Sequence, residues 1–192
     1  MSDTSTDLTG ALARFGSTLD LGDVPAEVKA DARRLLLDSI GCMISATRTR
    51  MALISDGLVD FLRHGNVASV AARKQHASLA GALYANGRLA NCTDLDETFP
   101  VGHHFGVAAV VAALALAEVH KAAGSRFLQA VITGYELAGR VASALGLLML
   151  FTEGRLTGFP VVYSCSASVM FAAVSRTGKG LPIPLLALQD QH

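Results

Sequence analysis

The sequence predicts an all-α fold for this chain of 192 residues, and three observations support that class. Apolar residues recur at three- and four-residue steps in successive segments, which is the period of an amphipathic helix. Glycine, proline and asparagine interrupt these segments, as expected for loops between helices. The chain is 51% hydrophobic and only 17% charged, so it can bury a core of its own.

The clearest helical pattern runs from Pro25 to Ser45. A proline near the first helical position and Glu27 in the first turn are typical of a helix start. Apolar residues then repeat on one face, while charged residues occupy the rest of the circumference. The stretch Val67–Ala72 is the one candidate for a short strand. Further helical patterns cover residues 51–63, 77–92, 107–122, 127–151 and 161–175.

Charge and composition exclude several classes of function. Lysine plus arginine and aspartate plus glutamate each number 16, so the chain has no basic excess with which to bind nucleic acid. The most apolar run, Phe105 to Ala117, is shorter than the roughly 20 residues that cross a bilayer. The first residues are polar, so we expect no signal peptide, no membrane contact and a cytoplasmic location. Three widely separated cysteines fit a reducing compartment.

A polar segment, NCTDLDETFPVGHHFG at residues 91–106, stands between apolar stretches. Asp94 and Thr98 are four residues apart, so a continuing helix would place them on one face. A proline and a glycine then break the chain. This puts His103 and His104 at the start of the next helix, where free backbone N–H groups favour a bound anion. Because histidine exchanges protons near neutral pH, we expect a site for small carboxylic acids here.

Structural roles are also open to these residues. Asp94 and Thr98 have the side chains of ordinary helix caps. Asp96 and Glu97 are expected on a solvated face. Adjacent histidines on a helix point about 100° apart. Since the ligand spacing of a metal site is missing as well, we predict no metal.

Four segments resemble the MmgE/PrpD family, in the order and spacing of that family. LARFGSTLDLGDVPAEVKADARRLLLDSIGCMIS resembles its first long helix, and GALYANGRLANCTDLDET is similar to its Ala-Asn-Gly segment that runs into Asp-Phe-Asp-Asp-Thr. GHHFGVAAVVAALALAE resembles its His-Pro-Ser helix, and GYELAGRV its Gly-Tyr-Glu helix. The resemblance implies an all-α, bundle-like helical domain and, in complete members, a smaller α+β lid domain.

The resemblance also implies a site. Asp94 and Thr98 match the active-site Asp and Thr of the family, His104 matches its active-site His, and His103 is extra. Members include 2-methylcitrate dehydratase, cis-aconitate decarboxylase and iminodisuccinate epimerase. They act on di- and tricarboxylic acids without a metal or organic cofactor, usually as homodimers. By analogy we expect a catalytic His104 that acts as acid and base, a catalytic Asp94 that orients or assists it, and substrate binding by Thr98 and His103.

Two departures from the family pattern shape the expected function. The second active-site histidine of the family is replaced by Gly158-Phe159-Pro160, and family members are more than twice this length. We therefore expect a truncated helical domain at residues 1–180, an atypical tail at 181–192 and no lid domain. The leading function is a 2-methylcitrate-dehydratase-type lyase, complete or incomplete. The alternatives are an inactive helical remnant or dimerisation module, an iminodisuccinate-type epimerase and a cis-aconitate-type decarboxylase.

Overall fold

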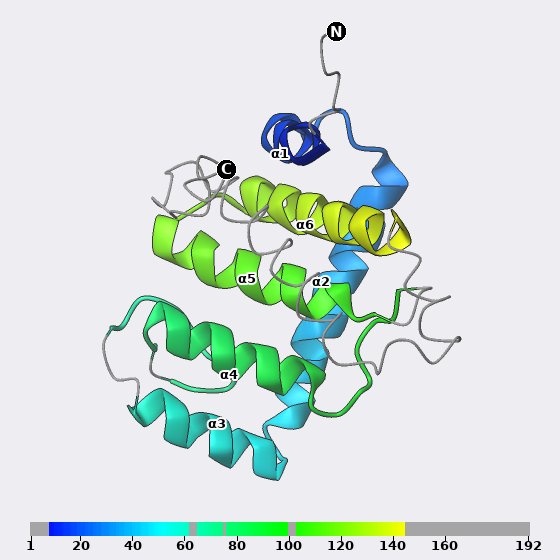
Figure 1. Ribbon diagram of the computed structural model, residues 1–192. Helices are drawn as coiled ribbons and strands as arrows, with labels where there is room; N and C mark the ends of the chain where they lie inside the picture. The colour runs from blue at the N-terminus through cyan, green and yellow to red at the C-terminus, as the bar shows by residue number, and fades with distance from the viewer. Residues whose placement is uncertain (1–7, 62–64, 75, 100–102, 145–192) are drawn as a thin grey trace, which may run out of the picture.

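The computed structural model describes residues 8–61, 65–74, 76–99 and 103–144, and these ranges contain helices but no named strand (Figure 1). The predicted all-α class is therefore confirmed for the described part of the chain. The helices are α1 (Leu8–Thr18), α2 (Ala26–Ala46), α3 (Arg50–Phe61), α4 (Leu79–Asn91), α5 (Phe105–His120) and α6 (Gly124–Ala144).

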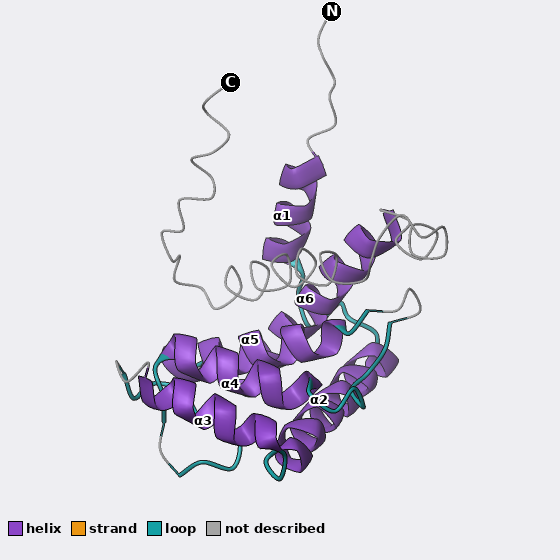
Figure 2. Cartoon of the chain, turned by 60° about the horizontal axis from the view of Figure 1, so that its bottom comes forward, coloured by secondary structure: helices purple, strands orange, loops and turns teal. Residues whose placement is uncertain are grey.

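Four helices form one layer in the order α3, α4, α5, α6, and α2 runs across them (Figures 1 and 2). The long helix α2 contacts α4, α5 and α6, whereas α1 packs on α6. With neighbours on both sides and α2 behind it, α5 is buried around most of its circumference. Its nearly uninterrupted apolar sequence follows from this position, because a helix that is hydrophobic all round needs cover on every side.

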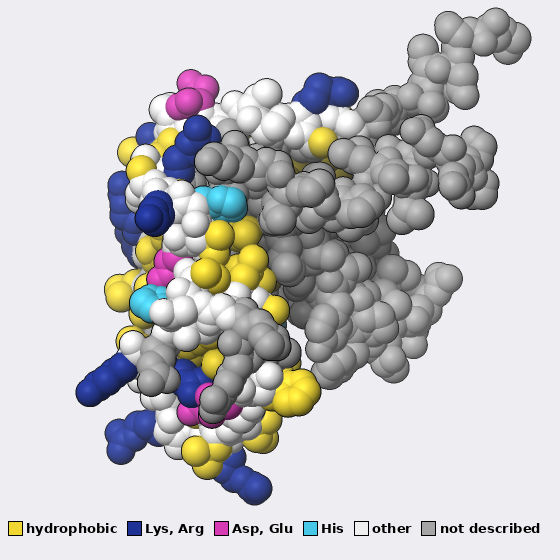
Figure 3. Space-filling view, turned by 90° about the vertical axis from the view of Figure 1, so that its left-hand side faces the viewer, with side chains coloured by type: hydrophobic (Ala, Val, Ile, Leu, Met, Phe, Trp, Pro, Cys, Tyr) yellow, Lys and Arg dark blue, Asp and Glu magenta, His cyan; other side chains and the backbone are white. Residues whose placement is uncertain are grey.

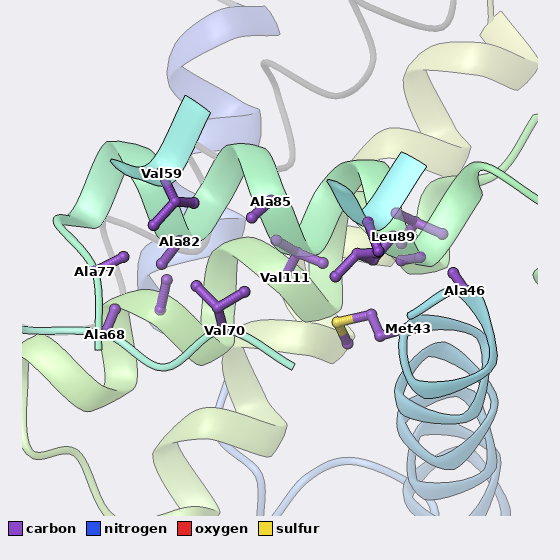
Figure 4. Packing of buried hydrophobic residues seen from close by; sticks show 14 residues of the cluster. Met43, Ala46, Val59, Ala68, Val70, Ala77, Ala82, Ala85, Leu89 and Val111 are labelled. Atoms are coloured by element: carbon purple, nitrogen blue, oxygen red, sulfur yellow. The ribbon is translucent and has the colours of Figure 1, made fainter. Parts of the chain in front are cut away.

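The core between α3, α4 and α5 is built largely from small residues (Figure 4). Ala82 and Ala85 of α4 have no exposed surface, and the larger Leu89 and Val111 fill the space beside them. Met43 closes this cluster from the end of α2. Alanines at the contact allow the helix axes to approach closely, and interiors packed in this way leave few voids.

The expected strand at Val67–Ala72 is wrong, because the structure has only an isolated bridge between Ala68 and Ala77 there. Side chains of the neighbouring helices hold this segment instead. The Asn86 side chain donates to the Ser69 carbonyl and accepts from the Ala71 N–H, both at 2.9 Å. The Glu118 carboxylate accepts from the Ser69 N–H at 2.7 Å and from its hydroxyl at 2.6 Å. These polar contacts replace the second strand that a sheet would need.

The other expected helices that fall on described residues are present, with ends shifted by a few positions. Helix α4 begins at Leu79, because the Ser78 side chain accepts a hydrogen bond from the Gly81 N–H and caps it. Helix α1 was not expected as a separate element: the segment likened to one long helix is divided by the turn at residues 19–25. The helix expected at residues 161–175 and the tail at 181–192 lie outside the described residues.

The surface carries exposed hydrophobic side chains among charges of both signs (Figure 3). Arg140 pairs with Glu136 one turn away on α6, and Arg73 pairs with Asp56 and Asp60 of α3. No helix within the described ranges combines the length and hydrophobicity needed to cross a bilayer.

We predict that Asn86→Ala destabilises the fold by about 2–4 kcal/mol, because two partly buried backbone groups, the Ser69 carbonyl and the Ala71 N–H, lose their partners at once. Asn86 is only 2% exposed, so water does not replace these bonds without structural change. Urea unfolding followed by circular dichroism measures the difference. Asn66→Ala, in an exposed part of the same loop, is the control and should change stability by less than about 0.5 kcal/mol. Equal effects of the two changes would contradict the role assigned to Asn86.

Candidate active site

The predicted site lies in the loop between α4 and α5. Helix α4 ends at Asn91, and Asp94 has a left-handed backbone with a φ of 55°, which aspartate tolerates better than most residues. Asp94 and Thr98 therefore do not share a helix face, and that expectation is wrong. His104 is the N-cap residue of α5, as the break before it predicted.

His104 lies between two carboxylates. Its Nε2 atom is 3.6 Å from Oδ1 of Asp94, and its Nδ1 atom is 3.1 Å from Oδ2 of Asp96. The two acids differ in their surroundings: the side chain of Asp94 is 86% exposed, whereas that of Asp96 has no exposed surface. The structure thus brings the predicted Asp94 and His104 together. It adds Asp96 on the Nδ1 side of the His104 ring, which faces the protein interior.

Asp96 was expected on a solvated face, and the structure corrects this. The Asn91 side-chain nitrogen lies 3.3 and 3.4 Å from its two oxygens. Burial raises the pKa of Asp96, and the charge of His104 opposes part of that rise. A loop that folds back over α2 and α5 has removed this carboxylate from water, which an acidic run in the sequence does not reveal.

Glu97 was also expected to be solvated, but it caps α5. Its Oε2 atom accepts the Gly106 N–H at 2.8 Å, and its Oε1 atom accepts the Tyr135 hydroxyl of α6. The Glu97 N–H in turn donates to Asp38 of α2 at 3.1 Å. Burial raises the pKa of Glu97, while the bonds from Tyr135 and Gly106 lower it in part. The positive end of α5, expected to receive a substrate carboxylate, is therefore occupied by a carboxylate of the chain.

His103 points away from the acids and into an aromatic cluster. Its ring stacks on Phe105 with centroids 5.3 Å apart, and Phe99 and Tyr135 pack on the same phenyl ring. His103 is 6% exposed, and neither ring nitrogen has a hydrogen-bond partner among the described residues. Burial lowers the pKa of His103, and the neighbouring His104 lowers it further. A buried neutral imidazole results.

Thr98 is exposed, and no hydrogen bond within the described part of the chain joins its side chain to His104 or to the acids. The structure therefore assembles Asp94 and His104 but sets His103 and Thr98 apart from them. The catalytic and substrate-binding roles assigned to these four residues stay predictions.

A group of potential metal ligands coincides with this site. Asp94, Asp96 and His104 each place a ligand atom within 4.8 Å of the others. An imidazole gives one nitrogen to an ion, however, and here Nε2 faces one carboxylate while Nδ1 faces the other. The arrangement suits proton exchange at the ring better than coordination of a single ion by all three groups.

A cavity of about 560 Å³ opens between α2 and α6, and Glu97 lies at its edge. Its floor is apolar, and Glu97 and Tyr135 line it, whereas Asp94 and His104 do not. Within the described residues, no lysine or arginine pairs with Asp94, Asp96 or Glu97. The surroundings of His104 are thus acidic, and an anionic ligand needs cations from elsewhere or protonated carboxyls.

Sequence reasoning missed Asn91, Asp96, Glu97 and Tyr135 as parts of the site. One signal was available, because a glycine in the first turn of an apolar helix indicates a close approach by another group. A Cβ atom at Gly106 would lie 2.6 Å from Glu97 Oε2 and 2.4 Å from a methyl group of Leu35. The sequence alone could not identify the approaching group as Glu97.

Comparisons with known proteins place these observations in a family context. A family model described as the MmgE/PrpD N-terminal domain matches residues 10–174. A cis-aconitate decarboxylase-like protein of Aspergillus oryzae is 26% identical over 170 residues. That match covers 84% of this chain and 35% of the relative, so the chain spans about a third of the length of the curated protein it matches. No solved structure matches the chain significantly.

We predict that Gly106→Ala destabilises the fold by about 1–3 kcal/mol, because the new methyl group overlaps Glu97 and Leu35. Gly41→Ala in α2 is the matched control, since a Cβ atom there meets nothing within 4 Å. The control should stabilise the helix by up to about 1 kcal/mol. Chemical unfolding of both variants measures the contrast, and an equal gain at the two positions would contradict the close approach of Glu97.

We predict that Glu97→Gln changes how stability depends on pH. A carboxyl group whose folded pKa is raised contributes most below its ordinary pKa of about 4.3, and it loses that contribution as pH rises through the folded value. The free energy of unfolding of the variant, relative to the parent chain, should therefore increase as pH rises across this window. Urea unfolding between mildly acidic and neutral pH provides the measurement.

Glu27→Gln, at an exposed position in the first turn of α2, controls for the loss of one negative charge. A relative stability of Glu97→Gln that falls with rising pH would mean that hydrogen bonding, rather than burial, dominates at Glu97.

Proposed function

Because this chain belongs to the MmgE/PrpD family, we propose that it carries the acid/base part of a lyase site for di- or tricarboxylic acids. The resemblance predicted from four sequence segments is confirmed by the family match over residues 10–174. The observation that carries the proposal is the His104 imidazole held between Asp94 and Asp96 at the start of α5.

His104 is the proposed acid and base because imidazole exchanges protons near neutral pH. In a dehydration of the 2-methylcitrate type, Nε2 takes the proton from the carbon next to a carboxylate. The electron pair of the broken C–H bond forms the double bond, and the hydroxyl group leaves as water with a proton that the protonated His104 ring donates. Asp94, exposed beside Nε2, is proposed to assist this transfer, and no cofactor is required for it.

The proposed substrate contacts are Thr98 and His103. Thr98 offers an exposed hydroxyl group close in sequence to Asp94. Both ring nitrogens of His103 lack a described partner, and a buried imidazole gains when such groups are satisfied by a ligand or water. The acidic surroundings of His104 set a further requirement: cations from elsewhere, or protonated carboxyl groups, must offset the charge of a polyanionic substrate.

A second candidate reaction is decarboxylation, which the name of the Aspergillus oryzae relative favours. In that reaction a C–C bond to a carboxylate breaks, CO₂ leaves with no electron pair from that bond, and an acid delivers a proton to the remaining carbon. The protonated form of His104 would supply this proton. The ring would therefore take a proton from carbon in dehydration and give one to carbon in decarboxylation.

We also propose that the protein is a cytoplasmic homodimer. Leu37 and Ile44 support self-association, since they lie seven residues apart on one face of α2 and are 73% and 54% exposed. The formal net charge of zero removes a barrier to it. Light scattering of the purified chain measures the oligomeric state, and Leu37→Glu should shift a dimer toward monomer.

We predict that His104→Gln lowers kcat/KM by about 10²–10⁴-fold. The assay incubates the purified chain with 2-methylcitrate or cis-aconitate and follows the ultraviolet absorbance of the conjugated alkene together with CO₂ release. His76→Gln, an exposed histidine before α4, is the control and should leave turnover unchanged. Alkene formation without CO₂ indicates dehydration, and CO₂ release indicates decarboxylation. Equal turnover in the His104 and His76 variants, or none with either acid, would contradict the proposal.

A further inference from the structure

The two carboxylates beside His104 lie on opposite nitrogens of one ring and in opposite environments. Asp96 approaches Nδ1 at 3.1 Å from inside the protein, with no exposed side-chain surface. Asp94 approaches Nε2 at 3.6 Å from the solvent side and is 86% exposed. The closer carboxylate is thus also the one that water cannot screen.

A neutral imidazole carries a single proton on one of its two nitrogens, and an ionised carboxylate can only accept it. Asp94 and Asp96 therefore compete for the same N–H. A charge in a buried, low-dielectric position acts on its neighbour far more strongly than one at a similar distance in water. On both distance and burial, the competition favours a proton on Nδ1, the nitrogen that lies beside Asp96.

We infer that Asp96 is the positioning residue of His104, which holds the imidazole as the Nδ1–H tautomer and leaves Nε2 as the basic nitrogen. The inference deepens the proposed function, on which it rests for its catalytic meaning. It reassigns the orienting role expected of Asp94. Asp94, on the Nε2 side, instead lies where a substrate proton arrives.

Asn91 completes the arrangement from the last residue of α4. Its side-chain nitrogen contacts both oxygens of Asp96, so the carboxylate is held on one side by an amide and faces the ring on the other. The Nδ1 atom is sealed from solvent, and its N–H direction is not aligned with Asp96 as a full hydrogen bond. Catalytic hydrogen bonds are often poorly aligned in the absence of substrate and tighten when it binds.

Nitrogen-15 NMR of the histidine rings tests the inference without any substrate, because the two nitrogens have distinct shifts in each tautomer. At a pH where the histidines are neutral, the parent chain and Asp94→Asn should both show His104 with its proton on Nδ1. In Asp96→Asn, the new amide oxygen is expected to turn toward the Asn91 donor. Its NH₂ group then faces Nδ1, and the proton should move to Nε2.

The outcomes separate cleanly. A proton on Nε2 in the parent chain overturns the inference, and this measurement does not depend on whether Asp96→Asn folds. A tautomer that changes in Asp94→Asn rather than in Asp96→Asn overturns it as well. The expected pattern supports it, even in a chain that turns over neither acid; that combination would contradict the proposed function alone.

With an active chain, kinetics provide a second reading. A wrong tautomer at a catalytic imidazole lowers kcat by up to about 10⁴-fold while the geometry is retained. Asp96→Asn should therefore lower kcat with little change in KM, and Asp96→Glu should recover part of the lost rate. If Asp96→Asn and Asp96→Glu lowered kcat by the same factor and the tautomer of His104 did not change, Asp96 would have a merely structural role, and the inference would be wrong.

Discussion

Glu97 joins three helices at one point. Its carboxylate accepts hydrogen bonds from the first turn of α5 and from Tyr135 of α6, and its backbone N–H donates to Asp38 of α2. The loop on either side of it is fixed as a result. Asp96 comes directly before Glu97, and His104 lies two residues before Gly106. Together with the Asn91 contacts to Asp96 and the hydrogen bond from the Phe99 N–H to the His103 carbonyl, the Glu97 contacts set the imidazole beside the buried acid.

The same contact has an electrostatic cost that defines the site. Asp96 is buried and Glu97 is half-buried, and burial raises the pKa of each carboxyl group. Helix dipole, amide and hydroxyl donors offset part of the cost at Glu97, whereas at Asp96 the leading compensation is the His104 ring. Polar groups held in this way against their preference for water are typical of functional sites. Among the described residues, no lysine or arginine pairs with either of these two carboxyl groups.

The fold was predictable where the spacing of apolar residues follows the helical period throughout a segment. The apolar steps of α2 and the uninterrupted apolar run of α5 each identify a helix with one kind of environment. The segment at residues 67–72 misled, because Asn86 and Glu118, which are distant in sequence, provide its polar partners in place of a neighbouring strand. Asp94 and His104 were predictable from residue type and from the break before α5. Asp96, Glu97 and Tyr135 were not, because their roles depend on a loop that folds back and on a helix that arrives about 30 residues later.

The alanine-rich contact between α4 and α5 also restricts how this sequence can change over time. The side chains of Ala82 and Ala85 have no exposed surface, and a larger residue at either of them would push the two helix axes apart. The displacement would pass along α5 to its first turn, where the backbone at Gly106 already lies in close contact with Glu97. Substitutions in the contact between α4 and α5 are therefore coupled to the position of the His104 ring. Compensating substitutions would have to arise in pairs, one on each helix.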